Sequence, residues 1–292
     1  MIIDIHAHAV RKVGYHGKGL TSIATIEQLE KYYSQEGIDK VCLLPLCGPE
    51  FHLPQSNEEI LDFAANNQRF VPFCNIHPYA ISNSVDADLT DVMLYYKDQG
   101  CRGIGEATCL LPFDNPFVYN FFKCAAKAKL PVTIHIAHRK DRAYGLYDDP
   151  GLPKLEDTLK RFEDLIIVGH SQSFWAEMSI LETVNDRSGY PPYKIKDEGA
   201  VPKIMRKYGN LYGDLSAFSG YNALNRDHEY AAVFLNEFQD RLMFGLDICG
   251  DPEKAFVSDL KNLLCKFKED GIISPEIFDK VTYLNARKLY NI

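Results

Sequence analysis

The sequence predicts an α/β protein, a (β/α)8 TIM barrel with a long loop insertion after the sixth strand and a C-terminal helix. Two observations predict this fold. Short apolar runs recur along the 292 residues, and an amphipathic stretch follows each run. Most runs are apolar throughout, as in parallel strands that are covered on both faces, and eight βα repeats at this length fit a closed barrel.

The eight predicted strands are spread over the whole chain. They cover residues 2–6, 40–46, 70–76, 101–107, 131–136, 165–170, 210–216 and 241–247. An open, doubly wound sheet is the competing arrangement, but no glycine-rich phosphate turn follows the first strand. We therefore expect a ring of strands whose carboxyl ends share one rim.

The predicted helices fill the intervals between the strands. They cover residues 24–36, 57–68, 84–98, 117–129, 153–163, 200–208, 226–238 and 252–269. A closing helix at about 275–290 follows Ser274-Pro275, because proline suits the first helical position. Gly37 and Gly100 stand where helix C-caps are expected.

The longest connection, residues 171–199, follows the sixth strand. It contains a candidate extra helix at 174–185 and the only tryptophan, Trp175. Connections of this length are either lids over a site or plain surface insertions, and both explanations stay open. No linker, charge block or low-complexity tract divides the chain, so we expect residues 1–292 to form one domain.

The composition limits the classes of function. A formal net charge of −8 opposes nonspecific binding to polyanions. No apolar run approaches the roughly 18–20 residues of a membrane span. The N-terminus lacks a secretory signal pattern, and the eight cysteines form no C-x-x-C pair, which predicts free thiols and a cytoplasmic location. We expect a small-molecule substrate and neither a nucleic-acid nor a membrane partner, with a homodimer left open.

Metal-binding side chains stand at the ends of five predicted strands. They are His6 and His8 on the first strand, Glu106 on the fourth, His135 on the fifth, His170 on the sixth and Asp247 on the eighth. Imidazoles and carboxylates bind borderline or hard divalent ions, and strand ends of a barrel converge at one rim. His6 and His8 are two positions apart and therefore share a face of their strand.

Each of these residues also has an ordinary structural explanation. Glu106 could cap a turn and His170 could cap the helix after it. Asp247 could be the N-cap of helix 252–269, although Asp251 suits that role better. Because all the candidates lie at strand ends, their joint pattern predicts a divalent-metal site at the barrel mouth.

Other residues near this rim are candidates for substrate contact. His138 lies three positions after His135 and faces the other way, which suggests a rim or substrate-binding residue. Arg139, Lys140 and Arg142 suit a carboxylate or phosphate, against the alternative of a solvated charged loop. The candidates for an apolar substrate wall, with core packing as the alternative, are Trp175, Phe113, Phe117 and Tyr221.

Two further polar candidates lie near strand ends. Asp214, on the seventh strand, could support a metal ligand or contact the substrate, and His77, after the third strand, could face the site. The weaker histidine candidates, in predicted loops or on a helix, are His16, His52 and His228.

These motifs resemble the amidohydrolase superfamily, and within it the amidohydrolase-related (amidohydrolase 2) group. The matching motifs are DIHAH, TIHIAH, VGHS and FGLD, and the closing helix VTYLNARKLYNI is also similar. The resemblance spans nearly the whole chain. It implies one or two divalent ions, zinc by preference with manganese as the alternative. The fourth strand, RGIGEAT, departs from members with a modified lysine and resembles the TatD-like branch, in which a glutamate bridges two metals.

The resemblance also implies roles for the candidate residues. His6, His8 and Asp247 would hold the more buried ion, and His135 and His170 a second one, with the fourth-strand glutamate bridging them. Asp247 would take the proton of the nucleophilic water. With a single ion, His135 would join the first set, and His170 would polarise the substrate or act as an acid.

The function implied is hydrolysis of a small amide, ester or lactone by a metal-activated water. The alternatives are a zinc-dependent nonoxidative decarboxylase of an unsaturated or aromatic acid and a small-phosphoester hydrolase. A barrel with a closed, purely structural metal is the non-enzymatic alternative.

Overall fold

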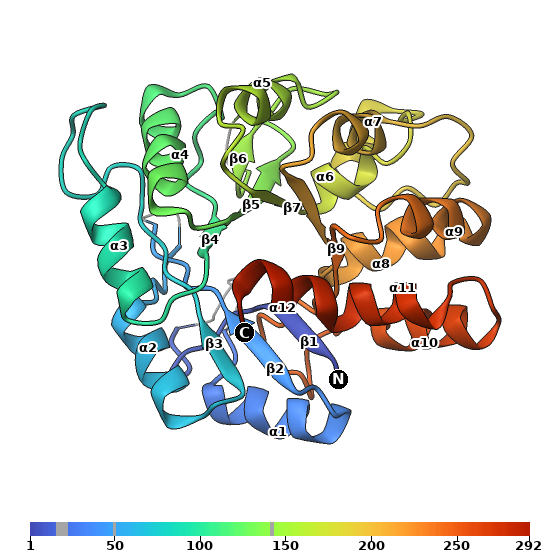
Figure 1. The fold of residues 1–292 in the computed structure, drawn as a ribbon, viewed down its shortest axis with the longest axis horizontal. Helices are drawn as coiled ribbons and strands as arrows, with labels where there is room; N and C mark the ends of the chain where they lie inside the picture. The colour runs from blue at the N-terminus through green and yellow to red at the C-terminus, as the bar shows by residue number, and fades with distance from the viewer. Residues whose placement is uncertain (16–22, 49–50, 141–142) are drawn as a thin grey trace.

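The computed structural model describes residues 1–15, 23–48, 51–140 and 143–292 of the chain. Its strands, which alternate with helices, are β1 (Ile3–Ala7), β2 (Lys40–Leu43), β3 (Phe70–Pro72), β4 (Ile104–Ala107), β5 (Val132–Ala137), β6 (Leu146–Tyr147), β7 (Ile167–His170), β8 (Leu211–Asp214) and β9 (Leu242–Met243). All of them except β6 fall inside the predicted strands or extend one of them by a single residue. Figure 1 shows them around a common centre, with helices outside.

The helices largely follow the predicted intervals. They are α1 (Ile26–Glu36), α2 (Asn57–Asn66), α3 (Thr90–Asp98), α4 (Pro116–Ala128), α5 (Pro153–Arg161), α6 (Gln172–Ala176), α7 (Ala200–Lys207), α8 (Ala217–Asn225), α9 (His228–Glu237), α10 (Leu260–Glu269), α11 (Pro275–Asp279) and α12 (Asn285–Tyr290). A short 3₁₀ helix covers Val184–Ser188, and a π-helical turn, Lys280–Leu284, joins α11 to α12. The closing helix is therefore continuous from residue 275 to 290, as predicted.

The strands form a closed parallel ring. Two sheets, β1-β2-β3 and β4-β5-β7-β8-β9, are parallel throughout. At one seam Cys74, beyond β3, pairs with Ile104 of β4. At the other seam the N–H of Asp247 donates to the carbonyl oxygen of His6 at 2.9 Å. This closure confirms the predicted (β/α)8 barrel, with β6 as an extra short strand beside β5.

The closing helix seals the amino-terminal end of the barrel. Tyr290 and Ala286 of α12 are buried in one cluster with Ile5 and Phe73 from the strands. The rings of Tyr290 and Phe73 lie 5.0 Å apart, edge to face. In Figure 1, α12 lies across the middle of the strand ring. The opposite, carboxyl end of the barrel is therefore the end that can hold a site.

Helix ends follow local chemistry where the sequence predicted it. Gly37 ends α1 in the left-handed conformation, with φ of 66°, and Gly100 follows the C-cap of α3 with φ of 110°. These are backbone angles that side chains disfavour and glycine accepts. Ser274 accepts a hydrogen bond from the N–H of Ile277, which caps the closing helix at its start.

Three helical predictions need correction, and one helix was missed. The helix predicted over residues 84–98 begins only at Thr90. The insertion does not carry one helix over residues 174–185, because Ser171 caps the earlier α6 and the chain then turns irregularly. The helix predicted from residue 252 begins at Leu260, and its N-cap is Asp259 rather than Asp251. The helix α8 was not predicted, because its sequence after Ser216 is rich in small and polar residues that are typical of loops.

A buried ion pair lies within the insertion, and its arginine also joins the insertion to the segment around β6. The Nε of Arg187 donates to Oε1 of Glu177 at 2.7 Å, and both side chains are buried. Arg187 also donates to the carbonyl oxygen of Asp148, which lies just after β6. The insertion and the segment around β6 are thus held together as one wall of the mouth.

Two composition-based expectations have structural counterparts. The structure records no disulfide between cysteines of the described residues, and five of the eight cysteines are buried. Among the described residues, no helix is both long enough and apolar enough to cross a membrane.

Candidate metal centre

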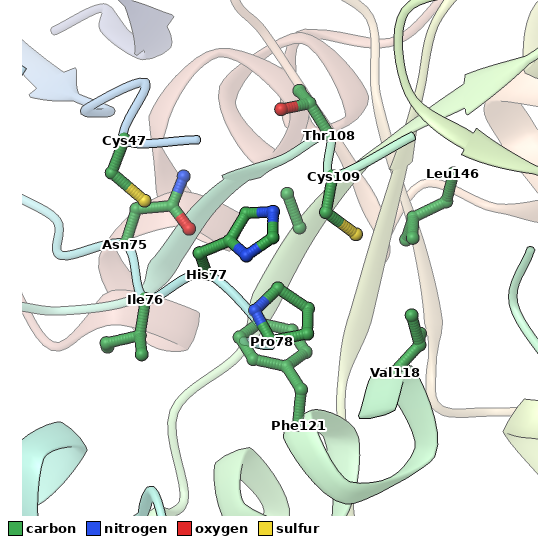
Figure 2. A pocket seen from close by; sticks show the side chains of 11 residues that line it. Cys47, Asn75, Ile76, His77, Pro78, Thr108, Cys109, Val118, Phe121 and Leu146 are labelled. Carbon is green, nitrogen blue, oxygen red and sulfur yellow. The ribbon is translucent and has the colours of Figure 1, made fainter. Parts of the chain in front are cut away.

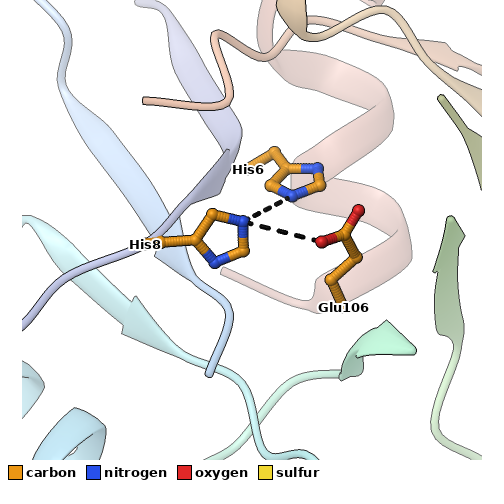
Figure 3. Close-up of side chains that lie close together, drawn as sticks. All are labelled: His6, His8 and Glu106. Carbon is orange, nitrogen blue, oxygen red and sulfur yellow. Dashed lines mark hydrogen bonds and ion pairs between the residues drawn. The ribbon is translucent and has the colours of Figure 1, made fainter. Parts of the chain in front are cut away.

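The carboxyl end of the barrel brings the predicted ligands together. The structure gathers them into overlapping groups whose ligand atoms lie within 4.8 Å of one another; they are His6, His8, Glu106, His135, His170 and Asp247. Each lies at or just beyond the end of β1, β4, β5, β7 or β9. Figure 3 shows His6, His8 and Glu106 directed at a shared point.

His6, His8 and Asp247 form the tightest set. The two Nε2 atoms are 3.1 Å apart, and Oδ1 of Asp247 is 3.6 Å from that of His6 and 3.4 Å from that of His8. Ligands around a tetrahedral zinc ion, each about 2.0–2.1 Å from the metal, lie about 3.3 Å apart. These three side chains are therefore already spaced as ligands of one small divalent ion.

Glu106 links this set to a second one. Its Oε2 is 3.8 Å from Nε2 of His8, whereas its Oε1 is 2.7 Å from Nδ1 of His135 and 3.9 Å from Nε2 of His170. Each carboxylate oxygen thus faces a different group of imidazoles. This division allows either one or two ions at the mouth.

The hydrogen bonds behind the rings decide which nitrogens can bind a cation. Nδ1 of His8 lies 2.7 Å from the carbonyl oxygen of Leu44, and Nδ1 of His6 lies 2.6 Å from Oδ2 of Asp214. Both Nδ1 atoms must therefore carry the proton, because their partners are acceptors. In the neutral rings, the lone pairs of the two Nε2 atoms then face each other, an arrangement that a cation between them stabilises.

The electrostatics of the buried site also favour a cation between His6 and His8. Burial lowers the pKa of His6, but the carboxylates of Asp247 and Asp214 outweigh it and raise the pKa to about 10. Burial raises the pKa of Glu106, yet the charge and hydrogen bond of His135 bring it down to about 2. Without a metal, a proton thus takes the cation's place between His6 and His8. The donor types and their charge balance fit a divalent ion.

Several side chains support the ligands from behind. Asp214 was expected as such a residue, and its carboxylate contacts His6. Ser216 was missed by the sequence reasoning; its Oγ lies 3.0 Å from Nδ1 of His170 and 3.4 Å from Nδ1 of His6. The signal was its position two residues after Asp214, at the end of the same strand. Tyr144 was also missed; its hydroxyl donates to Oε2 of Glu106 at 3.0 Å.

Replacing Asp214 with asparagine is expected to weaken divalent-metal binding about 10–100-fold, the usual effect of losing a carboxylate that orients a histidine ligand. An amide accepts the Nδ1–H of His6 less strongly and no longer compensates the charge of the centre. Competition with a chromophoric zinc chelator measures the change. Asp240→Asn is the control, since Asp240 is an exposed partner of Lys280. Equal affinity in all three proteins would contradict the assigned support.

The predicted substrate-binding residues have different locations. His138 and Arg139 are exposed just beyond β5, at the rim of the mouth, which is compatible with substrate contact. Lys140 lies over the ring of Tyr147, and Arg142 lies outside the described residues. Trp175 does not suit its predicted role, because it is buried and its indole N–H donates to the carbonyl oxygen of Asp214 at 2.7 Å. It packs behind the strand instead.

The aromatic and weaker histidine candidates lie mostly away from the ligands. Phe113 is fully buried, whereas Phe117 packs against Tyr79 with ring centroids 4.4 Å apart. Tyr221 packs against Phe218, which follows Ser216 by two residues. The weaker histidines His52 and His228 contact Tyr15 and Asn225, and His16 lies outside the described residues.

A small cavity lies beside the centre, between the segments that follow β2, β3 and β4 (Figure 2). Cys47, His77 and Cys109 are among its lining residues. Its free space is about 10 Å³, roughly that of one water molecule, so it is too small for an organic substrate. His77 lines this cavity and belongs to none of the candidate metal groups found among the described residues.

Comparison with known proteins gives a family and a set of folds. The family model described as amidohydrolase matches residues 55–292. None of the curated proteins gives a significant match. A solved structure of an amidohydrolase from Burkholderia multivorans with bound zinc is 14% identical, with a TM-score of 0.63, over 100% of this chain and 99% of that chain.

Two other solved structures have similar folds. A probable 2-pyrone-4,6-dicarboxylic acid hydrolase from Acinetobacter baumannii, with citric acid bound, is 15% identical with a TM-score of 0.62. The 5-carboxyvanillate decarboxylase from Sphingomonas paucimobilis is 16% identical with a TM-score of 0.59. Each match covers 100% of this chain and 99% of the other. At such identities the likeness shows the fold alone.

Proposed function

Because this chain belongs to the amidohydrolase family, we propose that it is a metal-dependent hydrolase that uses a metal-activated water on a small amide, ester or lactone. The family match makes it an enzyme of a class whose structural neighbours include a hydrolase and a decarboxylase. The choice of hydrolysis within that class is our proposal. We further propose zinc as the metal, with manganese as the alternative, since imidazole nitrogens dominate the ligand set.

The facing Nε2 atoms of His6 and His8 support the proposal most strongly. The two imidazole nitrogens lie 3.1 Å apart with the Asp247 carboxylate beside them, a spacing that suits a cation at the carboxyl end of the barrel. A purely structural metal site is usually closed by four protein ligands. Here the side chains of Asp247 and His135 remain partly exposed, so the site is open to solvent on that side.

A divalent ion held at this site would lower the pKa of its water from 15.7 to about 7 and so supply a nucleophile at neutral pH. His6, His8 and Asp247 would hold the ion, with Glu106, His135 and His170 facing it or a second one. Asp247 lies where it can accept the proton of the nucleophile and pass it to the leaving group. Its Oδ2 lies 3.5 Å from Nε2 of His170.

His170 is placed to polarise the substrate or to donate a proton. Its Nδ1 faces Ser216 and Asp214, so its Nε2 is directed into the mouth. Burial lowers the pKa of His170 and the charge of His6 lowers it further, yet the hydrogen bond to Asp247 and the nearby carboxylates raise it overall. In a single-ion site, the Nε2 of His170 would thus be free to face a substrate oxygen.

Nonoxidative decarboxylation of an unsaturated or aromatic acid is the second candidate. The three-residue set of His6, His8 and Asp247 would suffice for a single ion, and a decarboxylase is among the structures with this fold. The number of ions therefore bears on the reaction: two ions with Glu106 bound favour hydrolysis.

A substrate panel tests the choice between the two reactions. Protein loaded with zinc or manganese is assayed with small lactones, esters and amides for acid release, and with aromatic carboxylic acids for CO₂ release. We expect metal-dependent acid release from a member of the first group. CO₂ release without hydrolysis would replace the proposal by the second candidate. No metal-dependent turnover in either group would reject both.

A further inference from the structure

We propose that Tyr144 is a positioning residue of the metal centre, which fixes the plane of the Glu106 carboxylate so that its two oxygens serve two separate ions. The inference rests on the proposed metal-dependent function and deepens it. None of the sequence motifs contains Tyr144, and it lies on no predicted strand. Tyr144 contacts both Glu106 and His135.

The first contact is the hydrogen bond from the Tyr144 hydroxyl to Oε2 of Glu106, at 3.0 Å. The other carboxylate oxygen, Oε1, accepts from Nδ1 of His135 at 2.7 Å. A carboxylate held at both oxygens cannot rotate about its last side-chain bond without breaking one of these hydrogen bonds. The Tyr144 ring also packs edge-on against His135, with centroids 4.8 Å apart.

The orientation that results has a consequence for metal binding. It directs Oε2 towards His8 and Oε1 towards His135 and His170, so Glu106 belongs to two candidate ligand groups at once. Each oxygen keeps a second lone pair after it has accepted its hydrogen bond. One carboxylate can therefore contribute a ligand atom to an ion on each side.

The backbone around Tyr144 is built to hold it there. The strand β6 pairs in parallel with β5, with Leu146 opposite Ile136. Gly145, between Tyr144 and β6, has φ of 113°, and a Cβ there would lie 2.5 Å from the carbonyl oxygen of His135. Only glycine allows so close an approach. The close approach of Gly145 to His135 therefore places the neighbouring Tyr144 beside the Glu106–His135 pair.

Metal stoichiometry and affinity test the role of the hydroxyl. Zinc content and zinc titrations are compared for the wild-type chain, Tyr144→Phe and the control Tyr147→Phe. Tyr147 lies on β6, and its hydroxyl contacts Asp149 rather than a ligand. We expect two ions in the wild-type and control proteins. In Tyr144→Phe we expect the first ion to be retained and the second to bind about 10–100-fold more weakly.

A spectroscopic readout separates positioning from a general loss of structure. In the manganese(II) forms, two ions that share a carboxylate couple magnetically. The coupled electron paramagnetic resonance signal should be present in the wild-type and Tyr147→Phe proteins and replaced by an uncoupled signal in Tyr144→Phe.

Three results would overturn the inference. They are a single ion in the wild-type protein, unchanged binding of both ions in Tyr144→Phe, and the same loss in Tyr147→Phe. The first two do not contradict metal-dependent catalysis, which the chelation and substrate experiments test separately. Failure of the proposed function has a different signature, because the wild-type chain would then bind no divalent ion or would turn over equally well after chelation.

Discussion

Asp247→Asn is expected to lower kcat about 10²–10⁴-fold, the range associated with loss of a general base. Asparagine has almost the same shape but cannot take a proton from the nucleophile. Burial raises the pKa of Asp247, but the charge of His6 and the hydrogen bonds from His170 and His8 hold it well below its usual range, so the carboxylate is ionised in the native protein. Steady-state kinetics with the substrate found in the panel measure the loss.

The Asp247→Asn variant should remain folded. Asp247 has a left-handed backbone with φ of 53°, a conformation that asparagine tolerates as well as aspartate. Circular dichroism and thermal unfolding check this point. The control is Asp251→Asn, since the Asp251 carboxylate pairs with the exposed Lys254 and accepts from the N–H of Glu253, contacts that involve none of the proposed ligands. Full activity in Asp247→Asn, or unfolding of that variant, would contradict the catalytic assignment.

Removal of the metal by chelation is expected to lower activity about 10³-fold, because a water without a metal remains a weak nucleophile at neutral pH. Zinc or manganese should restore activity. Metal binding should also depend on pH, since a divalent ion must displace the proton that His6 holds in the metal-free protein, where Asp247 and Asp214 raise its pKa to about 10. Apparent affinity should fall about tenfold for each pH unit between about pH 8 and 6.

Titrations at several pH values, with the metal-free protein prepared by dialysis, measure both effects. A calorimetric comparison in buffers of different ionisation enthalpy counts the protons released. Unchanged turnover in the metal-free protein would exclude metal catalysis. A pH-independent affinity would instead show that the His6 ring is already neutral before the ion binds.

The convergence of the ligands was predictable because, in a barrel, any residue at the carboxyl end of a strand lies at the same rim. His6, Glu106, His170 and Asp247 are far apart in the chain, but each ends a strand, and the strand ends of a parallel ring meet at one rim. Only the assignment of the strands was needed. The apolar runs provided it, because strands buried on both faces leave a continuous signal.

Residues that reach the site from loops were not predictable in this way. Tyr144 reaches Glu106 only because the chain approaches His135 closely at Gly145 and pairs as β6, a two-residue strand without an apolar run of its own. Trp175 was misplaced for the converse reason. It lies in the insertion that the sequence suggested as a lid, yet the short helix α6 carries it into the core.

The seam between β9 and β1 has a consequence for biosynthesis. His6 and His8 are synthesised long before Asp247, whose N–H bonds to the carbonyl oxygen of His6. A nascent chain that lacks the last strand therefore offers an ion two imidazoles and no closing carboxylate. The proposed three-ligand set is therefore complete only after Asp247 has been synthesised and the seam has closed, so an ion held by all three ligands would stabilise the last steps of folding and not the earlier ones.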